Sequence, residues 1–201
     1  AGHRAGRCHR YRRHSLGEPP GLEIAHVLEL FQLEFDAREE DGAARGVDFA
    51  GATTAVAWGD VDGDGAVDLF VCEFGSGNGL YMNQDGTGSS FVDEAGIRGV
   101  SSSRNCRQGT LVDVDLDGWL DVIALNFDQP VELFINNGAG GFVESGPSWG
   151  FDVSSVSQSV GVLDANGDGL IDLLVANGQF TDFLFMGTGG EFSEEAAARG
   201  F

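Results

Sequence analysis

Short apolar segments alternate with turns rich in Gly, Asn and Asp over most of the chain. Three of these segments are apolar at nearly every position and directly follow an acidic stretch, and a second short apolar run follows each of them. The runs are LFVCEF (69–74), VIALNF (122–127) and LLVANG (173–178), then LYMN (80–83), LFIN (133–136) and LFMG (184–187). Such runs between turn residues predict β-strands, and continuous apolar character predicts strands buried on both faces.

The acidic stretches themselves form an internal repeat. They are DVDGDGAVD (60–68), DVDLDGWLD (113–121) and DANGDGLID (164–172). Their regular spacing, with a period of about fifty residues, indicates a repeat architecture. Each unit also carries a Gly-rich turn, a Phe-led segment at Phe91, Phe142 or Phe192, and a closing pair, Arg98-Gly99, Trp149-Gly150 or Arg199-Gly200. The repeats therefore span 47–99, 100–150 and 151–201.

Each repeat offers about four strand candidates. The first strands are TTAVAW (53–58), GTLVDV (109–114) and SVGVLD (159–164), and each runs into an acidic loop. Four short strands in a unit of this length are typical of a propeller blade and not of a helical solenoid. We therefore expect an all-β fold, a β-propeller segment of about three four-stranded blades.

The N-terminal part follows a different pattern. Residues 1–20 contain Arg and His but only one acid, Glu18, and predict a flexible basic tail. Residues 21–46 contain apolar positions spaced as in a helix and end on Arg45-Gly46, the closing pair of the other repeats. We expect either a helix or the remnant of a preceding blade in that segment.

The acidic loops have the composition of cation sites. Counted from the first Asp, oxygen-bearing side chains stand at positions 1, 3, 5 and 9, Gly stands at position 6, and position 7 can offer its carbonyl oxygen. The predicted ligands are Asp60, Asp62, Asp64, Ala66 and Asp68; Asp113, Asp115, Asp117, Trp119 and Asp121; and Asp164, Asn166, Asp168, Leu170 and Asp172. In a tightly curled loop, alternate residues can turn their oxygens toward one ion.

The donor set favours calcium, with up to three ions bound. Calcium takes six to eight oxygen ligands in a flexible shell, whereas magnesium keeps its waters and zinc prefers His or Cys. The loops are not EF-hands, because the last acid arrives at position 9 and a strand follows. Asn166 removes one charge from the third loop, so we expect weaker binding there. A shell filled by protein oxygens with no base beside it indicates a structural site, and we expect no catalysis.

The net negative charge of the chain restricts the classes of partner that it can bind. The chain carries 32 acidic and 11 basic residues and a formal charge of −21. Such a surface repels nucleic acid and anionic membranes and attracts cations. No apolar run approaches the ~20 residues that span a bilayer, so we expect no membrane insertion.

The three cysteines, Cys8, Cys72 and Cys106, form no CxxC pair and no disulfide framework. A bridge between Cys72 and Cys106 is possible, but we expect buried free thiols.

The segments DVDGDGAVDLFV and LYMNQDGTGSSF resemble the FG-GAP/VCBS-type repeats of integrin-alpha-like β-propellers. The group related to cartilage acidic protein is the more similar one, over roughly residues 31–201. The resemblance implies a seven-bladed propeller, calcium in the hairpin loops of certain blades, an extracellular or cell-surface location, and roles in adhesion or recognition. Three repeats are fewer than a closed propeller needs, so we expect further blades outside this chain.

These features predict a calcium-binding, non-catalytic module for extracellular adhesion or for recognition of a protein or carbohydrate ligand. The alternative is an accessory propeller domain of a larger secreted enzyme. Sequence beyond residue 201 would distinguish them: a catalytic domain there favours the enzyme, and further repeats favour the binding module.

Overall fold

The computed structural model describes residues 41–48, 51–152, 154–178 and 181–200. The predictions for residues 1–20, and for most of 21–46, lie outside these residues. Within 21–46 only the short helix α2 (Asp41–Ala44), Arg45 and Gly46 are described.

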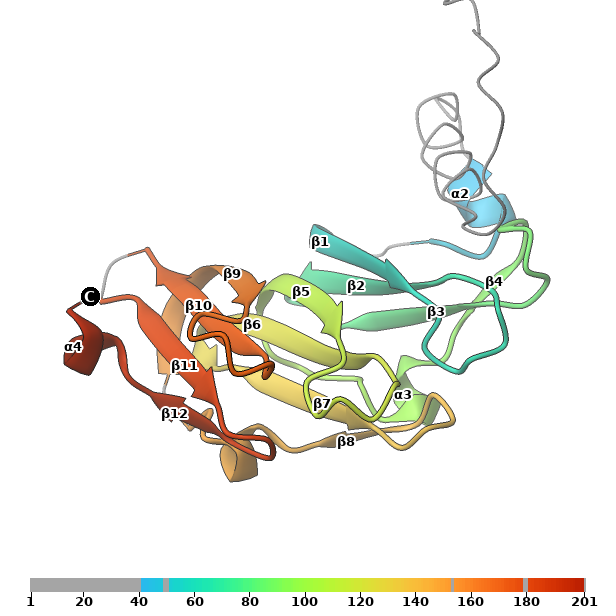
Figure 1. The fold of residues 1–201 in the computed structure, drawn as a ribbon. Helices are drawn as coiled ribbons and strands as arrows, with labels where there is room; N and C mark the ends of the chain where they lie inside the picture. Colours follow the sequence, from blue (N-terminus) through green and yellow to red (C-terminus); the bar gives the residue numbers. More distant parts are fainter. Residues whose placement is uncertain (1–40, 49–50, 153, 179–180, 201) are drawn as a thin grey trace, which may run out of the picture. The chain divides into compact units, whose positions relative to one another are not determined.

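Each repeat forms one four-stranded antiparallel unit (Figure 1). The first comprises β1 (Ala52–Gly59), β2 (Asp68–Phe74), β3 (Gly79–Asn83), β4 (Phe91–Asp93) and α3 (Ala95–Arg98). The second comprises β5 (Cys106–Val112), β6 (Asp121–Pro130), β7 (Glu132–Asn136), β8 (Phe142–Glu144) and the 3-10 turn η1 (Gly146–Trp149). The third comprises β9 (Ser154–Leu163), β10 (Asp172–Asn177), β11 (Phe183–Gly187), β12 (Phe192–Glu194) and α4 (Ala196–Arg199). The predicted all-β, propeller-like fold is confirmed.

The long strand β6 links the second and third units. Its far end pairs with the start of β9, with Phe127 opposite Val156, so the two units share one eight-stranded sheet. The first unit forms a separate sheet in the order β1-β2-β3-β4 and packs on the second through side chains.

Side chains along each inner strand point alternately to its two faces, and both faces are buried, which explains why these strands are apolar at nearly every position. In β2, Phe70 and Cys72 pack toward the second repeat, whereas Leu69 and Val71 face the other way. In β6, Val122 and Ala124 meet the first repeat, and Ile123 and Leu125 meet the third. Successive residues of a strand point to opposite faces. An inner strand that is buried on both faces therefore needs apolar residues at odd and even positions alike.

Cys72 and Cys106 form a disulfide, so the expectation of free thiols is wrong. Both cysteines are fully buried, as expected. Cys72 faces the following repeat, and Cys106 begins the first strand of that repeat. Their Cα atoms lie 5.2 Å apart, within the range that a disulfide spans. The bridge depends on packing between repeats, which a separation of 34 residues in sequence does not reveal.

Candidate metal centres

Each acidic loop joins the first strand of a repeat to the second and curls through two left-handed residues. In the first loop these are Gly63 and Gly65, with φ of 74° and 87°. The third loop has Gly167 and Gly169 at the same positions, and the second has Leu116 (φ 61°) and Gly118. Glycine adopts this conformation without steric cost, whereas leucine does not. The curl therefore forms in all three loops, with local strain at Leu116.

The Asp at position 1 organises the curl. Asp60 accepts hydrogen bonds from the backbone N–H groups of Gly63 (2.8 Å) and Gly65 (2.9 Å), one to each carboxylate oxygen. Asp164 accepts the corresponding N–H groups of Gly167 and Gly169. Asp113 accepts the N–H of Gly118 on one oxygen, and on the other it accepts the N–H of Asp117, one position further along the loop. For Asp164 these hydrogen bonds, led by the one from Gly169, lower the pKa of the carboxyl. Backbone dipoles therefore stabilise part of the crowded negative charge.

The Asp at position 5 closes a tight turn. Asp64 accepts a hydrogen bond from the N–H of Ala66 at 2.7 Å, and Asp117 and Asp168 accept equivalent bonds from Trp119 and Leu170. The turn fixes the peptide at position 7. The carbonyl oxygens of Ala66, Trp119 and Leu170 remain predicted ligands.

The Asp at position 9 is the most buried acid of each loop. Asp68, Asp121 and Asp172 are at most 1% exposed. Asp68 accepts N–H groups from Val61 (3.1 Å) and from Asn83 at the end of β3 (2.9 Å). Asp121 and Asp172 bind the matching residues of their own repeats. Burial raises the pKa of Asp68 and of Asp121 to about 6. This aspartate therefore ties the loop to two strands, a role that its spacing did not reveal.

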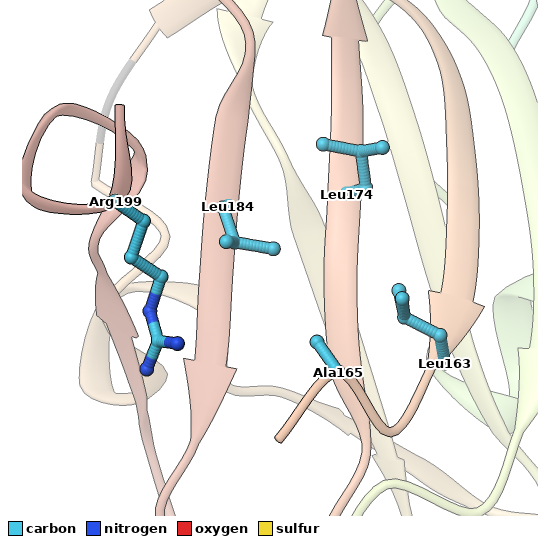
Figure 2. Close-up of a pocket in the computed structure, with 5 residues that line it drawn as sticks. All are labelled: Leu163, Ala165, Leu174, Leu184 and Arg199. Carbon is cyan, nitrogen blue, oxygen red and sulfur yellow. The ribbon is translucent and has the colours of Figure 1, made fainter. Parts of the chain in front are cut away.

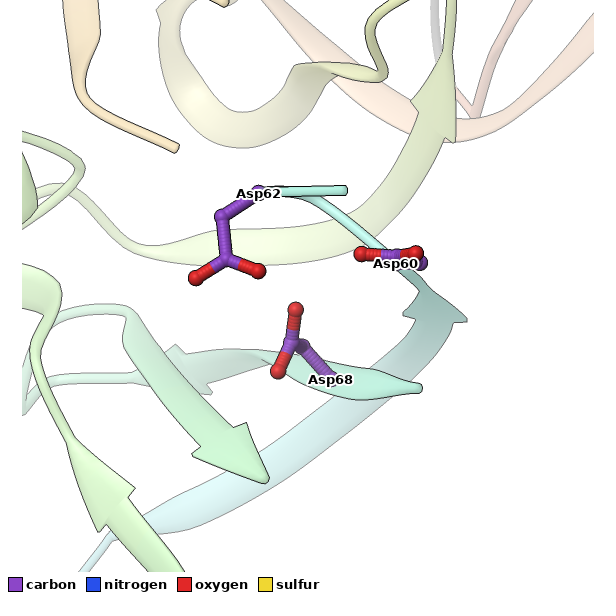
Figure 3. A group of neighbouring side chains, drawn as sticks. All are labelled: Asp60, Asp62 and Asp68. Carbon is purple, nitrogen blue, oxygen red and sulfur yellow. The ribbon is translucent and has the colours of Figure 1, made fainter. Parts of the chain in front are cut away.

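Two loops bring three carboxylates together. Asp60, Asp62 and Asp68 each place an oxygen within 4.8 Å of the others, and so do Asp113, Asp115 and Asp117. Figure 3 shows the side chains of Asp62 and Asp68 facing each other, with Asp60 beside them. Calcium–oxygen distances are about 2.3–2.6 Å, so oxygens with this separation can share one ion. Asp64 and Asp121 do not belong to these groups.

One oxygen of the first cluster lacks a partner. Asp62 Oδ1 is buried and accepts no hydrogen bond from the described residues. Its other oxygen, Oδ2, pairs with Arg98 at 3.0 Å. A buried acceptor without a donor is unfavourable, and a bound cation would satisfy it.

The third loop gathers no such cluster among the described residues. Asp164, Asn166 and Asp168 are all exposed. The side-chain amide of Asn166 donates to Asp168 Oδ2 at 2.8 Å, so a neutral group occupies an oxygen that a cation would otherwise bind.

The second repeat covers the first loop. The ring of Trp119 lies close enough to Gly63 that a Cβ there would come within 2.6 Å of it. The side-chain amide of Asn136 donates to the carbonyl of Val61 at 2.8 Å. Arg98 joins Asp62 to the carbonyl of Gly140 in the second repeat. Two repeated features of the sequence could have signalled this clamp: the matching Asn at the ends of LYMN and LFIN, and the recurring Arg-Gly closing pair that contains Arg98.

The fold and the loops together define a propeller-like array of acidic-loop repeats. The model of the FG-GAP-like repeat family matches residues 60–123 and 113–175, and each match begins at the first Asp of an acidic loop. These matches cover more than half of the chain, which therefore belongs to the FG-GAP-like repeat family. A search among curated proteins gave no match. Among the described residues, no helix is long and apolar enough to cross a membrane.

Proposed function

We propose that this chain is a calcium-binding, non-catalytic propeller module for recognition outside the cell. The observation that carries the proposal is the pair of three-carboxylate clusters in the first two acidic loops. Every candidate donor is oxygen, as calcium prefers, and the open curl can supply further oxygens from Asp64, from position-7 carbonyls and from water. The ion would neutralise repulsion among the acids and hold the loop against the strands.

The non-catalytic part of the proposal rests on how the acids are used. Asp60 and Asp113 each accept backbone N–H groups on both carboxylate oxygens, and the position-9 acids tie strands together. Carboxylates held in this way support loop geometry. A general base, by contrast, needs to reach a substrate.

The disulfide supports a location outside the cell. Bridges of this kind persist in oxidising compartments and are rare in the cytosol, where thiols are kept reduced. FG-GAP repeats are also typical of extracellular proteins. We propose that the partner is a protein or carbohydrate that meets the loops connecting the strands, and that calcium maintains the shape of that surface.

Thermal unfolding with calcium and with chelator tests the calcium sites. Calcium at a hundred times its Kd contributes about 2.7 kcal/mol per site, so the unfolding midpoint should rise by about 5 °C or more. Asp62→Asn/Asp115→Asn should remove about half of that rise. Asp128→Asn/Asp152→Asn removes the same two charges from exposed positions outside the loops and should retain it. An unchanged midpoint in chelator would contradict the proposal.

Two further measurements test location and recognition. Thiol titration of the unfolded secreted protein should find one free thiol, Cys8, before reduction and three afterwards. Binding to arrays of glycans and extracellular proteins should be stronger in calcium than in chelator. The Asp62→Asn/Asp115→Asn variant should lose this difference, and equal binding in both conditions would argue against a calcium-maintained surface.

A further inference from the structure

An arginine packs against two phenylalanine rings where the first repeat meets the second. The guanidinium carbon of Arg107 lies 4.6 Å from the ring centroid of Phe127 and 5.9 Å from that of Phe74. The two ring centroids are 6.1 Å apart, and their planes are tilted by 60°. Phe74 is 40% exposed, and Arg107 and Phe127 are partly exposed. The rings therefore hold a cation at the protein surface.

Arg107 makes no hydrogen bond or ion pair through its side chain with any described residue, and its Nε is buried. The other described arginines each bind a carbonyl oxygen or a carboxylate: Arg45, Arg98, Arg104 and Arg199. Arg199, for example, borders an apolar pocket of about 480 Å³ (Figure 2), but Glu195 holds its guanidinium at 2.8 Å. In a chain with 32 acidic and 11 basic residues, a cation without a counter-charge is available to a ligand.

Two β-bulges shape the strands around this arginine. Arg107 is the extra residue where β5 pairs with β6, between Cys106 and Gln108. Asp128 is the extra residue where β6 pairs with β9, and it holds a left-handed φ of 56°. A bulge redirects the side chain that it carries, and bulges and strained non-glycine residues both recur beside functional sites. The local backbone thus departs from a regular sheet at the position of the unpaired cation.

The disulfide fixes the two strands that carry the cation and the more exposed ring. Cys106 immediately precedes Arg107, and its partner Cys72 lies two residues before Phe74. β5 runs into the second acidic loop and β2 starts from the first, so this group lies at the strand ends remote from both loops. A site that is held in its binding geometry before the ligand arrives loses less entropy on binding.

We propose that Arg107, Phe74 and Phe127 form a recognition site for a protein partner that presents a carboxylate side chain beside an apolar one. The carboxylate would accept hydrogen bonds from the two terminal nitrogens of Arg107, because the Nε is buried. Guanidinium and carboxylate match well in such a bidentate pair. The apolar side chain would pack on the exposed ring of Phe74. The inference rests on the recognition role proposed above and names the chemistry of the partner.

The surroundings favour a protein over an acidic polysaccharide. A phenylalanine ring offers no hydrogen-bonding group to sugar hydroxyls. The side-chain oxygen of neighbouring Gln108 already accepts the N–H of Val160, and that of Gln129 accepts the N–H of Asn105. The exposed Asp128 and the formal charge of −21 repel a ligand that carries many negative charges. One carboxylate beside an apolar group suits a single cation beside two rings.

A titration with two synthetic peptides, followed by nuclear magnetic resonance, tests the site. The probe is a short peptide with one Glu between Phe and Leu, and its control has Gln in place of that Glu. The Glu peptide should shift the Nε–H signal of Arg107 saturably, and the Gln peptide should leave it unchanged. Equal shifts with both peptides, or no shift with either, would overturn the proposal.

Substitutions then locate the contact, with affinity measured on backbone amide signals. Arg107→Gln should weaken binding of the Glu peptide by about tenfold or more, because the cation is lost. Phe74→Ala should weaken it by about threefold, because an apolar contact is lost. Arg107→Lys keeps the charge but not the planar pair of donors, so its affinity should be intermediate.

Arg199→Gln is the matched control, because it removes an arginine that Glu195 already binds. This variant should bind the Glu peptide as the natural protein does. Unchanged affinity in Arg107→Gln, or an equal loss in Arg199→Gln, would contradict the assignment to Arg107. Should Arg107→Gln fail to fold, Arg107→Lys and the comparison of the two peptides still decide the question.

Glucuronate tests the competing ligand, and we expect it to bind more weakly than the Glu peptide. Equal or tighter binding of glucuronate would overturn the assignment to a protein partner. All titrations are run in calcium and in chelator. Peptide binding in calcium alone would support the site and show that its shape needs the ion. Absence of binding in both conditions overturns this site and leaves the calcium proposal to the unfolding experiment.

Discussion

The first and third acidic loops share one ligand spacing but differ in their surroundings. Both curl through two left-handed glycines, and both place a buried Asp at position 9. The first loop is flanked by Trp119, Asn136 and Arg98 and gathers three carboxylates. The third loop is exposed from residue 164 to residue 169 and gathers no such group among the described residues. Spacing therefore shapes the loop, whereas the following repeat determines how its acids are covered.

The largest expected effect concerns the buried Asp at position 9, which the first and third loops share. Asp68→Ala and Asp172→Ala each leave two backbone N–H groups without their acceptor. Because an unsatisfied buried donor costs about 1–3 kcal/mol, each variant should lower the free energy of unfolding by about 2–5 kcal/mol. Denaturant unfolding in chelator measures this cost. A loss confined to calcium-containing buffer would show that position 9 acts only through the ion.

A smaller effect concerns position 3, where the two loops differ. Asn166→Asp adds a charged ligand and removes the amide that occupies Asp168, so calcium affinity of the third loop should rise about tenfold. Asp62→Asn should lower affinity at the first loop by a similar factor. Calorimetric titration resolves the sites when each change is made in an Asp115→Asn background. No change at the third loop would mean that exposure, and not charge, limits binding there.

The dependence of stability on pH should also distinguish the loops in the calcium-free protein. The pKa of Asp68 is raised from 3.8 to about 6 by burial, so its folded form binds a proton more tightly than the unfolded chain. Its contribution is fully present below pH 4 and is lost as the pH rises to about 6. The pKa of Asp164 is lowered, so its contribution is present above pH 4 and is lost on acidification.

Variants separate these two contributions. In chelator, Asp68→Ala should remove the part of the stability curve that falls between pH 4 and 6. Asp164→Ala should leave that part unchanged and weaken the loss of stability at lower pH. Unfolding midpoints measured from pH 3 to 7 provide the comparison, and an Asp68→Ala curve parallel to that of the natural protein would contradict it.

The smallest effect concerns backbone strain in the second loop. Leu116 holds a φ of 61° where the other loops have Gly63 and Gly167, and its side chain is 53% exposed. Leu116→Gly should stabilise the protein by about 0.5–1 kcal/mol, because relief of left-handed strain exceeds the entropy cost of glycine. Gly167→Ala introduces a side chain at the same left-handed position of the third loop and should destabilise the protein. Denaturant midpoints measure both, and a destabilising Leu116→Gly would indicate that the leucine makes a favourable contact.

Much of the fold could be predicted because its signals are local. The inner strands are apolar at nearly every position, and Gly and Asn mark the turns between strands. These two patterns were enough to predict the four-stranded repeats from the sequence. The disulfide could not be predicted, because Cys72 and Cys106 meet only when two repeats pack. The two roles of Asp68, as ligand candidate and as acceptor for two strands, also required the positions of Val61 and Asn83.

By itself, the sequence determined the repeat, the strands and the spacing of acids around each loop, since these depend on side-chain alternation and on glycine at fixed positions. Only the tertiary structure decided which carboxylates converge and that, among the described residues, Asp62 keeps a buried oxygen without a donor. Those properties arise where one repeat covers the next. Residues about fifty positions apart create that environment, and no single repeat encodes it.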